Sequence, residues 1–215
     1  MKRTLILAAV VAVVAAGTAP AMAQDTMTVT ITNISKQIIS PPVVASHTWK
    51  VAIFVPGQEA SDELTGLAED GGPGALADML EAHDEVLDVA VADGLLFPGE
   101  SAQFEVEMRG KYNRISAVGM LVSTNDAFFG LSNFQVDPNN AVQRTTAPAW
   151  DAGTEFNNED CDFIPGPPCG SPFMRATEDA EGFIHVHSGI HGTGDLSPGD
   201  WDWQNPVVQI AVIKN

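Results

Sequence analysis

The stretch Ser101-Ala102-Gln103-Phe104-Glu105-Val106-Glu107-Met108 decides the fold class. Polar and apolar side chains alternate from Gln103 to Met108, and this period of two is typical of a β-strand with one buried and one solvated face. Residues 114–122 follow after a turn at Gly110 and are nearly all apolar or small, so they predict a central strand. The two patterns together favour an antiparallel sheet.

Similar strand patterns recur on both sides of this pair, separated by turns rich in glycine, proline and asparagine. Two short helical segments interrupt them, one from Ser61 to about Glu69 and one around Leu76 and Leu80. Many short strands with little helix predict an all-β fold, an antiparallel β-sandwich with two short helical excursions. The expected strands are residues 26–33, 48–55, 86–92, 101–108, 114–122, 133–136, 142–146, 182–187 and 206–213.

The first 23 residues have the features of a signal peptide. Lys2 and Arg3 form a charged start, residues 5–16 an apolar run, and Ala21-Met22-Ala23 a cleavage site with small residues. The apolar run is shorter than the ~20 residues that a membrane-spanning helix needs. We therefore expect a mature chain of residues 24–215 that forms one domain, has no transmembrane segment, and is periplasmic or secreted.

The expected mature chain is strongly acidic, with eight basic and 28 acidic residues and a formal charge of −20. This balance argues against nucleic acid as a partner, because such binding depends on neutralising phosphates with basic side chains. It also argues against electrostatic adsorption to anionic lipid. The carboxylates are interpreted as a solubilising surface, with the alternative that some of them cluster around cations.

Cys161 and Cys169 are the only cysteines in the sequence. In an oxidising compartment this pair is expected to form a disulfide that closes a short, proline-rich loop. A redox-active pair would have the tighter Cys-x-x-Cys spacing, so we predict a structural role.

Two acidic stretches are candidates for a metal site. Trp150-Asp151-Ala152-Gly153-Thr154-Glu155 places two carboxylates four residues apart, and Asp126 lies in the stretch that begins at Ser123, directly after the predicted central strand. Gly153 lets the backbone turn sharply enough for Asp151 and Glu155 to face one point. Calcium prefers such oxygen-rich sites, so Asp126, Asp151 and Glu155 are the predicted ligands. The simpler alternative is that Asp151 caps a turn through its own backbone.

These stretches also carry a family resemblance. Asn125-Asp126-Ala127-Phe128-Phe129-Gly130, followed by Trp150–Glu155, resembles the spondin N-terminal domain, which occurs in secreted matrix proteins and in many bacterial exported proteins. The resemblance extends to Val29–Asn33, Ser40–Val44 and Asn205–Val208, and so covers nearly all of residues 24–215.

The resemblance implies a secreted antiparallel β-sandwich that carries one calcium ion at its loop end and acts in adhesion and recognition. In animal members the second motif reads Asp-Ala-Gly-Thr-Asp, and Asp151 and Glu155 stand at its two carboxylate positions. Asp126 stands where the first motif carries its aspartate. Glu155 departs from the animal pattern by one methylene, which changes the distance at which it can coordinate an ion.

Histidines offer a rival site. His185 and His187 point to the same face of a predicted strand, and His191 follows after a short turn. Three imidazoles with an open fourth position would suit zinc or copper in a periplasmic metal-binding protein or metalloenzyme. His-Val-His also occurs in copper–zinc superoxide dismutases, but only His47 and His83 remain as further histidines, in unrelated contexts. Local hydrogen bonding is the simpler interpretation of these residues.

The sequence offers little for catalysis. It contains no Gly-x-Ser-x-Gly motif and no phosphate-cradling loop. Trp201 and Trp203 could stack against a sugar, although core packing is the commoner role of tryptophan. We predict an exported, calcium-stabilised binding or adhesion module with no catalytic activity of its own, acting as a monomer on a cell-surface or matrix ligand. A structural envelope protein without a specific ligand is a further alternative.

Overall fold

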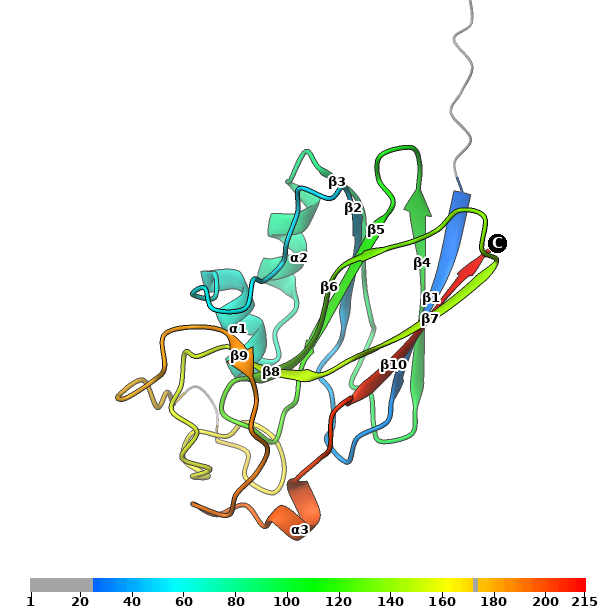
Figure 1. The fold of residues 1–215 in the computed structure, drawn as a ribbon. Coiled ribbons are helices and arrows are strands. Elements are labelled where there is room, and N and C mark those ends of the chain that lie inside the picture. Colours follow the sequence, from blue (N-terminus) through cyan, green and yellow to red (C-terminus); the bar gives the residue numbers. More distant parts are fainter. Residues whose placement is uncertain (1–24, 172–173) are drawn as a thin grey trace, which may run out of the picture.

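The structure is a computed structural model that describes residues 25–171 and 174–215 as a β-sandwich (Figure 1). The signal peptide predicted at residues 1–23 lies outside the described residues. The strands are β1 (Asp25–Asn33), β2 (Val43–His47), β3 (Val86–Val91), β4 (Ser101–Met108), β5 (Arg114–Met120), β6 (Ala127–Gln135), β7 (Val142–Ala147), β8 (Ala149–Asp151), β9 (His185–Val186) and β10 (Val208–Lys214). The helices are α1 (Asp62–Asp70), α2 (Gly74–Glu81) and α3 (Pro198–Trp201).

The strands form two antiparallel sheets, which confirms the predicted fold class. One sheet has four strands in the order β4-β1-β10-β7, and the other has six in the order β3-β2-β5-β6-β8-β9. The strand predicted at residues 114–122 does lie inside its sheet, between β2 and β6. The two-residue strand β9 ends the larger sheet beside β8, at the end of the molecule where the long loops gather (Figure 1).

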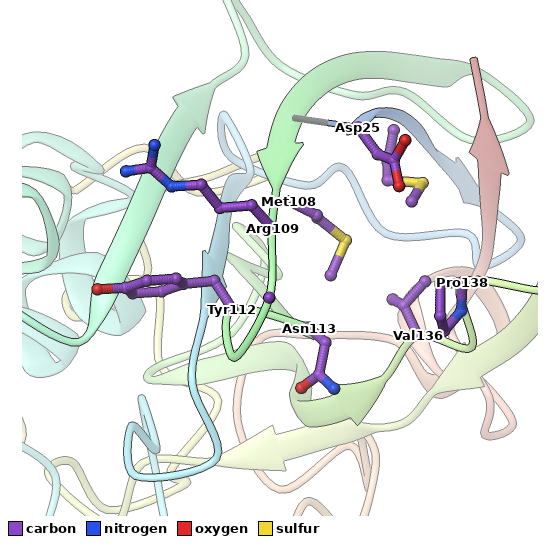
Figure 2. A pocket seen from close by; sticks show the side chains of 9 residues that line it. Asp25, Met108, Arg109, Tyr112, Asn113, Val136 and Pro138 are labelled. Atoms are coloured by element: carbon purple, nitrogen blue, oxygen red, sulfur yellow. The ribbon is translucent and has the colours of Figure 1, made fainter. Parts of the chain in front are cut away.

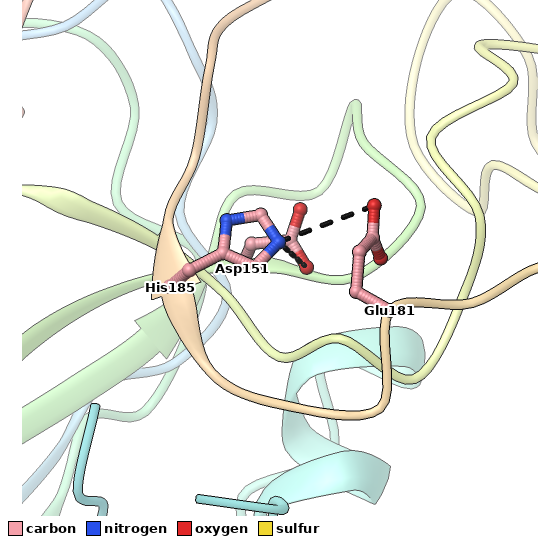
Figure 3. A group of neighbouring side chains, drawn as sticks. All are labelled: Asp151, Glu181 and His185. Atoms are coloured by element: carbon pink, nitrogen blue, oxygen red, sulfur yellow. Dashed lines mark ion pairs between the residues drawn. The ribbon is translucent and has the colours of Figure 1, made fainter. Parts of the chain in front are cut away.

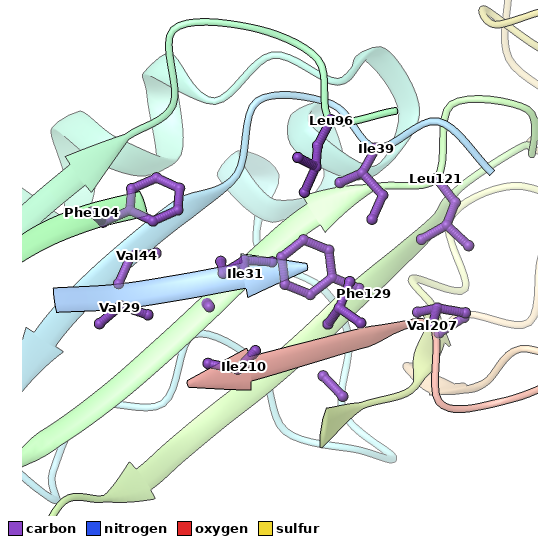
Figure 4. Packing of buried hydrophobic residues seen from close by; sticks show 14 of the residues in the cluster. Val29, Ile31, Ile39, Val44, Leu96, Phe104, Leu121, Phe129, Val207 and Ile210 are labelled. Atoms are coloured by element: carbon purple, nitrogen blue, oxygen red, sulfur yellow. The ribbon is translucent and has the colours of Figure 1, made fainter. Parts of the chain in front are cut away.

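The larger sheet is buried on both faces. On its inner face Phe129 packs against Ile31 and Ile210 of the smaller sheet (Figure 4). On its outer face, which α1 and α2 cover (Figure 1), Val118 and Phe128 share a core cluster with the buried leucines of these helices. Because both faces of β5 are covered, its sequence is continuously apolar or small instead of alternating.

The two predicted helical excursions are present, and their ends follow from local chemistry. The Ser61 side chain accepts the backbone N–H of Leu64 at the start of α1. Gly71 ends this helix in the left-handed conformation at φ 68°. The one-turn helix α3 was not predicted. Among the described residues, none of the helices is long and apolar enough to cross a membrane.

The prediction of a strand at residues 48–55 is wrong. Strand β2 lies before it, starting at Val43 directly after Pro42, and the backbone leaves the sheet once Thr48 has bonded to Glu85. Val51 and Phe54 are nevertheless buried, because they pack beneath the helices as an irregular segment. The apolar pattern in this segment therefore reports burial and not strand pairing.

Two other expected strands have different bounds. The strand predicted at 133–136 is only the end of β6, which begins at Ala127, and the one predicted at 182–187 shrinks to β9. Cys161 and Cys169 form the predicted disulfide, with their Cα atoms 4.9 Å apart. It closes a loop within the long connection between β8 and β9.

Candidate metal centre

The two acidic stretches meet where β6 pairs with β8. Ala127 stands opposite Asp151 in this antiparallel pair, and the backbone N–H of Ala152 donates to the carbonyl of Asp126 over 3.3 Å. Both aspartates are fully buried. Asp151 is the last residue of β8, a strand that was not predicted from the sequence. Strand pairing therefore places Asp126 and Asp151 next to each other. A cation site shared by the two acidic segments needs this proximity.

The Asp126 carboxylate is held at one oxygen and free at the other. Its Oδ2 accepts the backbone N–H groups of Thr154 at 2.8 Å and Glu155 at 3.0 Å, and the Thr154 hydroxyl at 3.2 Å. Its Oδ1 is buried and has no hydrogen-bond partner among the described residues. Burial raises the pKa of Asp126 well above its usual value, and the nearby charge of Asp151 raises it further. The unpartnered oxygen is the kind of atom that a bound cation would satisfy.

Asp151 is oriented by its own turn and by a side-chain relay. Its Oδ1 accepts the backbone N–H of Gly153 at 2.7 Å, which is the turn cap that the sequence offered as an alternative. Its Oδ2 accepts from the Asn157 amide, whose oxygen lies 2.9 Å from Nε2 of His187. Burial raises the pKa of Asp151, and the Asn157 hydrogen bond and the charge of His185 oppose this shift. The cap does not exclude a ligand role, because a carboxylate oxygen can accept more than one bond.

Gly153 is required by the tight contact that follows β8. It has φ 70°, and a Cβ built on it would lie 2.6 Å from the backbone nitrogen of Phe183. The backbone N–H of Gly182 also donates to the Gly153 carbonyl over 2.8 Å. The segment before β9 is thereby fixed against the turn that carries Asp151.

Glu155 has different neighbours from the two aspartates. Its Oε1 accepts the backbone N–H of Ala176 at 3.0 Å, and its buried Oε2 has no partner within the described part of the chain. Burial raises the pKa of Glu155 to about 7. The charges that act on it most strongly are Glu69 and Asp70 at the end of α1 and Arg175, which pairs with both. The Glu155 backbone thus supports Asp126 while its carboxylate faces the end of α1.

The structure groups one predicted histidine with two carboxylates. His185 stands opposite Asp151 in the β8–β9 pair, and its Nε2 lies 3.7 Å from Asp151 Oδ1 and 4.0 Å from Glu181 Oε1 (Figure 3). Within residues 25–171 and 174–215, these three residues are the one set of metal-ligating side chains whose ligand atoms all lie within 4.8 Å of one another. Sequence reasoning missed Glu181, whose only signal was its position four residues before His185.

The other two predicted histidines have their own partners. His187 is buried, and its Nδ1 accepts the backbone N–H of Gly189 over 3.0 Å, so its Nε2 carries the proton donated to Asn157. Burial lowers the pKa of His187 to about 3, which keeps the ring neutral. His191 is exposed and its Nε2 lies 3.0 Å from the Ser188 hydroxyl. His187 therefore acts here as a support of Asn157 and Asp151.

A second missed residue, Glu159, joins the loops around the site. Its buried carboxylate accepts the backbone N–H groups of His191, Gly192 and Thr193. Its carbonyl accepts the N–H of Asp195 over 2.8 Å. Fully partnered in this way, Glu159 anchors one loop to another and is not free to bind an ion.

Two further features lie outside this centre. An apolar cavity of about 220 Å³, lined in part by Met27, lies at the opposite end of the sandwich, and Met108 and Val136 point into it (Figure 2). Asp25 at its edge is paired with Lys214 at 2.8 Å, and no predicted site residue lines it. Trp203 is buried in the core against His187, with ring centroids 5.0 Å apart, which is the core role weighed for it.

Residues 33–158 match the protein-family model described as Spondin_N. The match spans more than half of the 215 residues and includes Asp126, Asp151 and Glu155. No curated protein matches the sequence.

Proposed function

Because the chain belongs to the spondin N-terminal domain family, we propose that it is an exported binding module whose loops are stabilised by a calcium ion. The observation that carries the proposal is the buried pair of Asp126 and Asp151, joined through β6 and β8. No lysine or arginine of the described residues forms an ion pair with either carboxylate. Burying two such charges together is costly unless a cation compensates them.

The residues present fit a hard cation. Asp126 and Glu155 each have a buried carboxylate oxygen without a donor among the described residues, and Asp151 lies beside Asp126. Asp126 and Asp151 would hold the ion, and Glu155 is the third carboxylate proposed to bind it. A bound calcium ion supplies positive charge that offsets the mutual repulsion of the carboxylates. The chain itself supplies the orientation, through Thr154 and the backbone of Glu155 on Asp126.

The proposed role is recognition, without catalytic activity of its own. Phe156 and Phe183 are 45% and 44% exposed on the segments that the centre holds in place. Exposed aromatic side chains on fixed loops are effective contacts for a protein or glycan partner. The family resemblance suggests a partner on a cell surface or in an extracellular matrix, and the disulfide suits an oxidising compartment outside the cytoplasm.

Thermal unfolding with and without calcium tests this proposal. A ligand at 100 times its Kd stabilises the folded state by about 2.7 kcal/mol, which corresponds to a rise in Tm of roughly 5–10 °C for a domain of this size. Wild type and the exposed control Asp93→Asn should show this rise relative to a chelator. Asp126→Asn should not. A calcium response that survives in Asp126→Asn would refute the assignment.

A further inference from the structure

Asp151 has a second set of neighbours on the side away from Asp126. His185 comes from the strand paired with β8, and Glu181 comes from the segment that Gly153 and Gly182 hold against it. Asp151 is buried, whereas the Glu181 and His185 side chains are 29% and 30% exposed. The group therefore lies at the edge of the buried centre, with two of its three side chains partly open to solvent (Figure 3).

The His185 ring is oriented for metal coordination. Its Nδ1 lies 3.1 Å from the carbonyl of Val186 and donates to it, so Nε2 is the nitrogen that faces Asp151 and Glu181. That Nε2 is buried and has no hydrogen-bond partner in the described residues. The ring also packs against Phe183, with centroids 5.4 Å apart, which limits its rotation. A backbone carbonyl on the far nitrogen is the usual support of a metal-bound histidine.

The spacing of the ligand atoms suits an ion and not direct hydrogen bonds. Nε2 of His185 lies 3.7 Å from Asp151 Oδ1 and 4.0 Å from Glu181 Oε1, both too long for a hydrogen bond. Ligands about 2.0–2.1 Å from a tetrahedral zinc ion stand roughly 3.4 Å from one another. Only small side-chain movements would bring all three atoms to that separation.

The donor set also selects the class of ion. Calcium takes oxygen ligands, and an imidazole nitrogen disfavours it. One nitrogen and two carboxylate oxygens suit zinc and its first-row neighbours. Asp126, fully buried with an unpartnered oxygen, lies next to Asp151 and adds negative charge behind the group.

We propose that Asp151, Glu181 and His185 form a subsite for a divalent transition-metal ion, with zinc as its representative. The subsite is a further property of this chain. It shares Asp151 with the proposed calcium site, whereas Glu181 and His185 belong to the subsite alone. Its ligands differ from the three-histidine set expected from the sequence, because only His185 is shared.

Zinc titration calorimetry on chelator-treated, untagged protein tests the proposal in saturating calcium. We expect one zinc ion per chain, and at least ~10-fold weaker binding in both His185→Ala and Glu181→Gln, since even supporting residues of metal sites contribute 10–100-fold. His191→Ala, which alters an exposed histidine outside the group, should bind zinc as wild type does. The X-ray absorption spectrum of the bound zinc should show nitrogen and oxygen ligands and no sulfur ligand.

The proposal is overturned if wild type binds no zinc, or if His191→Ala weakens binding as much as His185→Ala does. Calcium-dependent melts of the same variants keep the two sites distinguishable. His185→Ala and Glu181→Gln should retain the calcium response that Asp126→Asn loses, so that either site can fail alone.

Discussion

Asp126 Oδ2 accepts the backbone N–H of Glu155 at 3.0 Å, although 29 positions separate the two residues in the chain. The turn after β8 thereby closes over the residue that precedes β6. Asp126 and the Asp151–Glu155 segment form one unit, in which a change on either side is felt by the other.

Gly153→Ala should destabilise the protein by at least about 3 kcal/mol. A left-handed backbone costs an alanine roughly 1–2 kcal/mol, and the new methyl group would also collide with the backbone of Phe183. Gly182→Ala is the matched control, because Gly182 has φ 78° but open space around its Cβ position. Urea unfolding should show a loss of only about 1–2 kcal/mol for the control. Equal losses in the two variants would mean that the contact with Phe183 is unimportant.

Glu155 should make the calcium-free protein less stable as the pH rises. Its pKa is about 7 in the folded state against an ordinary 4.5, so the folded state binds more protons between these values. The penalty is absent below about pH 4.5, grows through this window and is complete above about pH 7, where it reaches up to about 3 kcal/mol.

The Glu155→Gln variant isolates this effect. In a chelator it should be more stable than wild type at pH 8 and similar to it at pH 4.5, as measured by urea unfolding. The exposed substitution Glu178→Gln is the control. A constant difference between Glu155→Gln and wild type across this range would show that Glu155 does not titrate as described.

His47 should make the protein less stable as the pH falls, which is the opposite of the effect of Glu155. Its Nδ1 donates to the Thr48 carbonyl at 2.7 Å, and its Nε2 accepts the Ser116 hydroxyl at 2.8 Å. Burial lowers its pKa, so the unfolded state takes up a proton first as the pH falls below about 6.5, and stability is lost. His47→Gln should cost about 1–3 kcal/mol at pH 7.5 and less at pH 5. His191→Gln should change neither value.

The prediction of β4 succeeded because one face of that strand is exposed to solvent, so that polar and apolar residues alternate along it. The strand expected at residues 48–55 failed because an apolar alternation records burial and does not identify the backbone partners. Phe128 and Phe129 are buried in different core clusters, one on each face of the larger sheet. The sequence at the start of β6 therefore shows no alternation of polar and apolar residues. The start of β6 was therefore not predicted.

For the candidate site, the sequence predicted that the segments of Asp126 and Asp151 converge, and the pairing of β6 with β8 does bring them together. The direction of the Glu155 side chain was not predictable, because it depends on Ala176 and on the charges at the end of α1. Glu181 was missed because its approach to Asp151 depends on the backbone contact between Gly153 and Gly182.

The most direct test of the account is calcium titration calorimetry on chelator-treated protein at pH 7.5. We predict one calcium ion per chain, with a Kd between roughly 10⁻⁶ and 10⁻³ M. Asp126→Asn and Asp151→Asn should each abolish the binding heat, and Asp93→Asn should not. Absence of calcium binding in wild type, or unchanged binding in both site variants, would contradict the claim that the paired aspartates hold the ion.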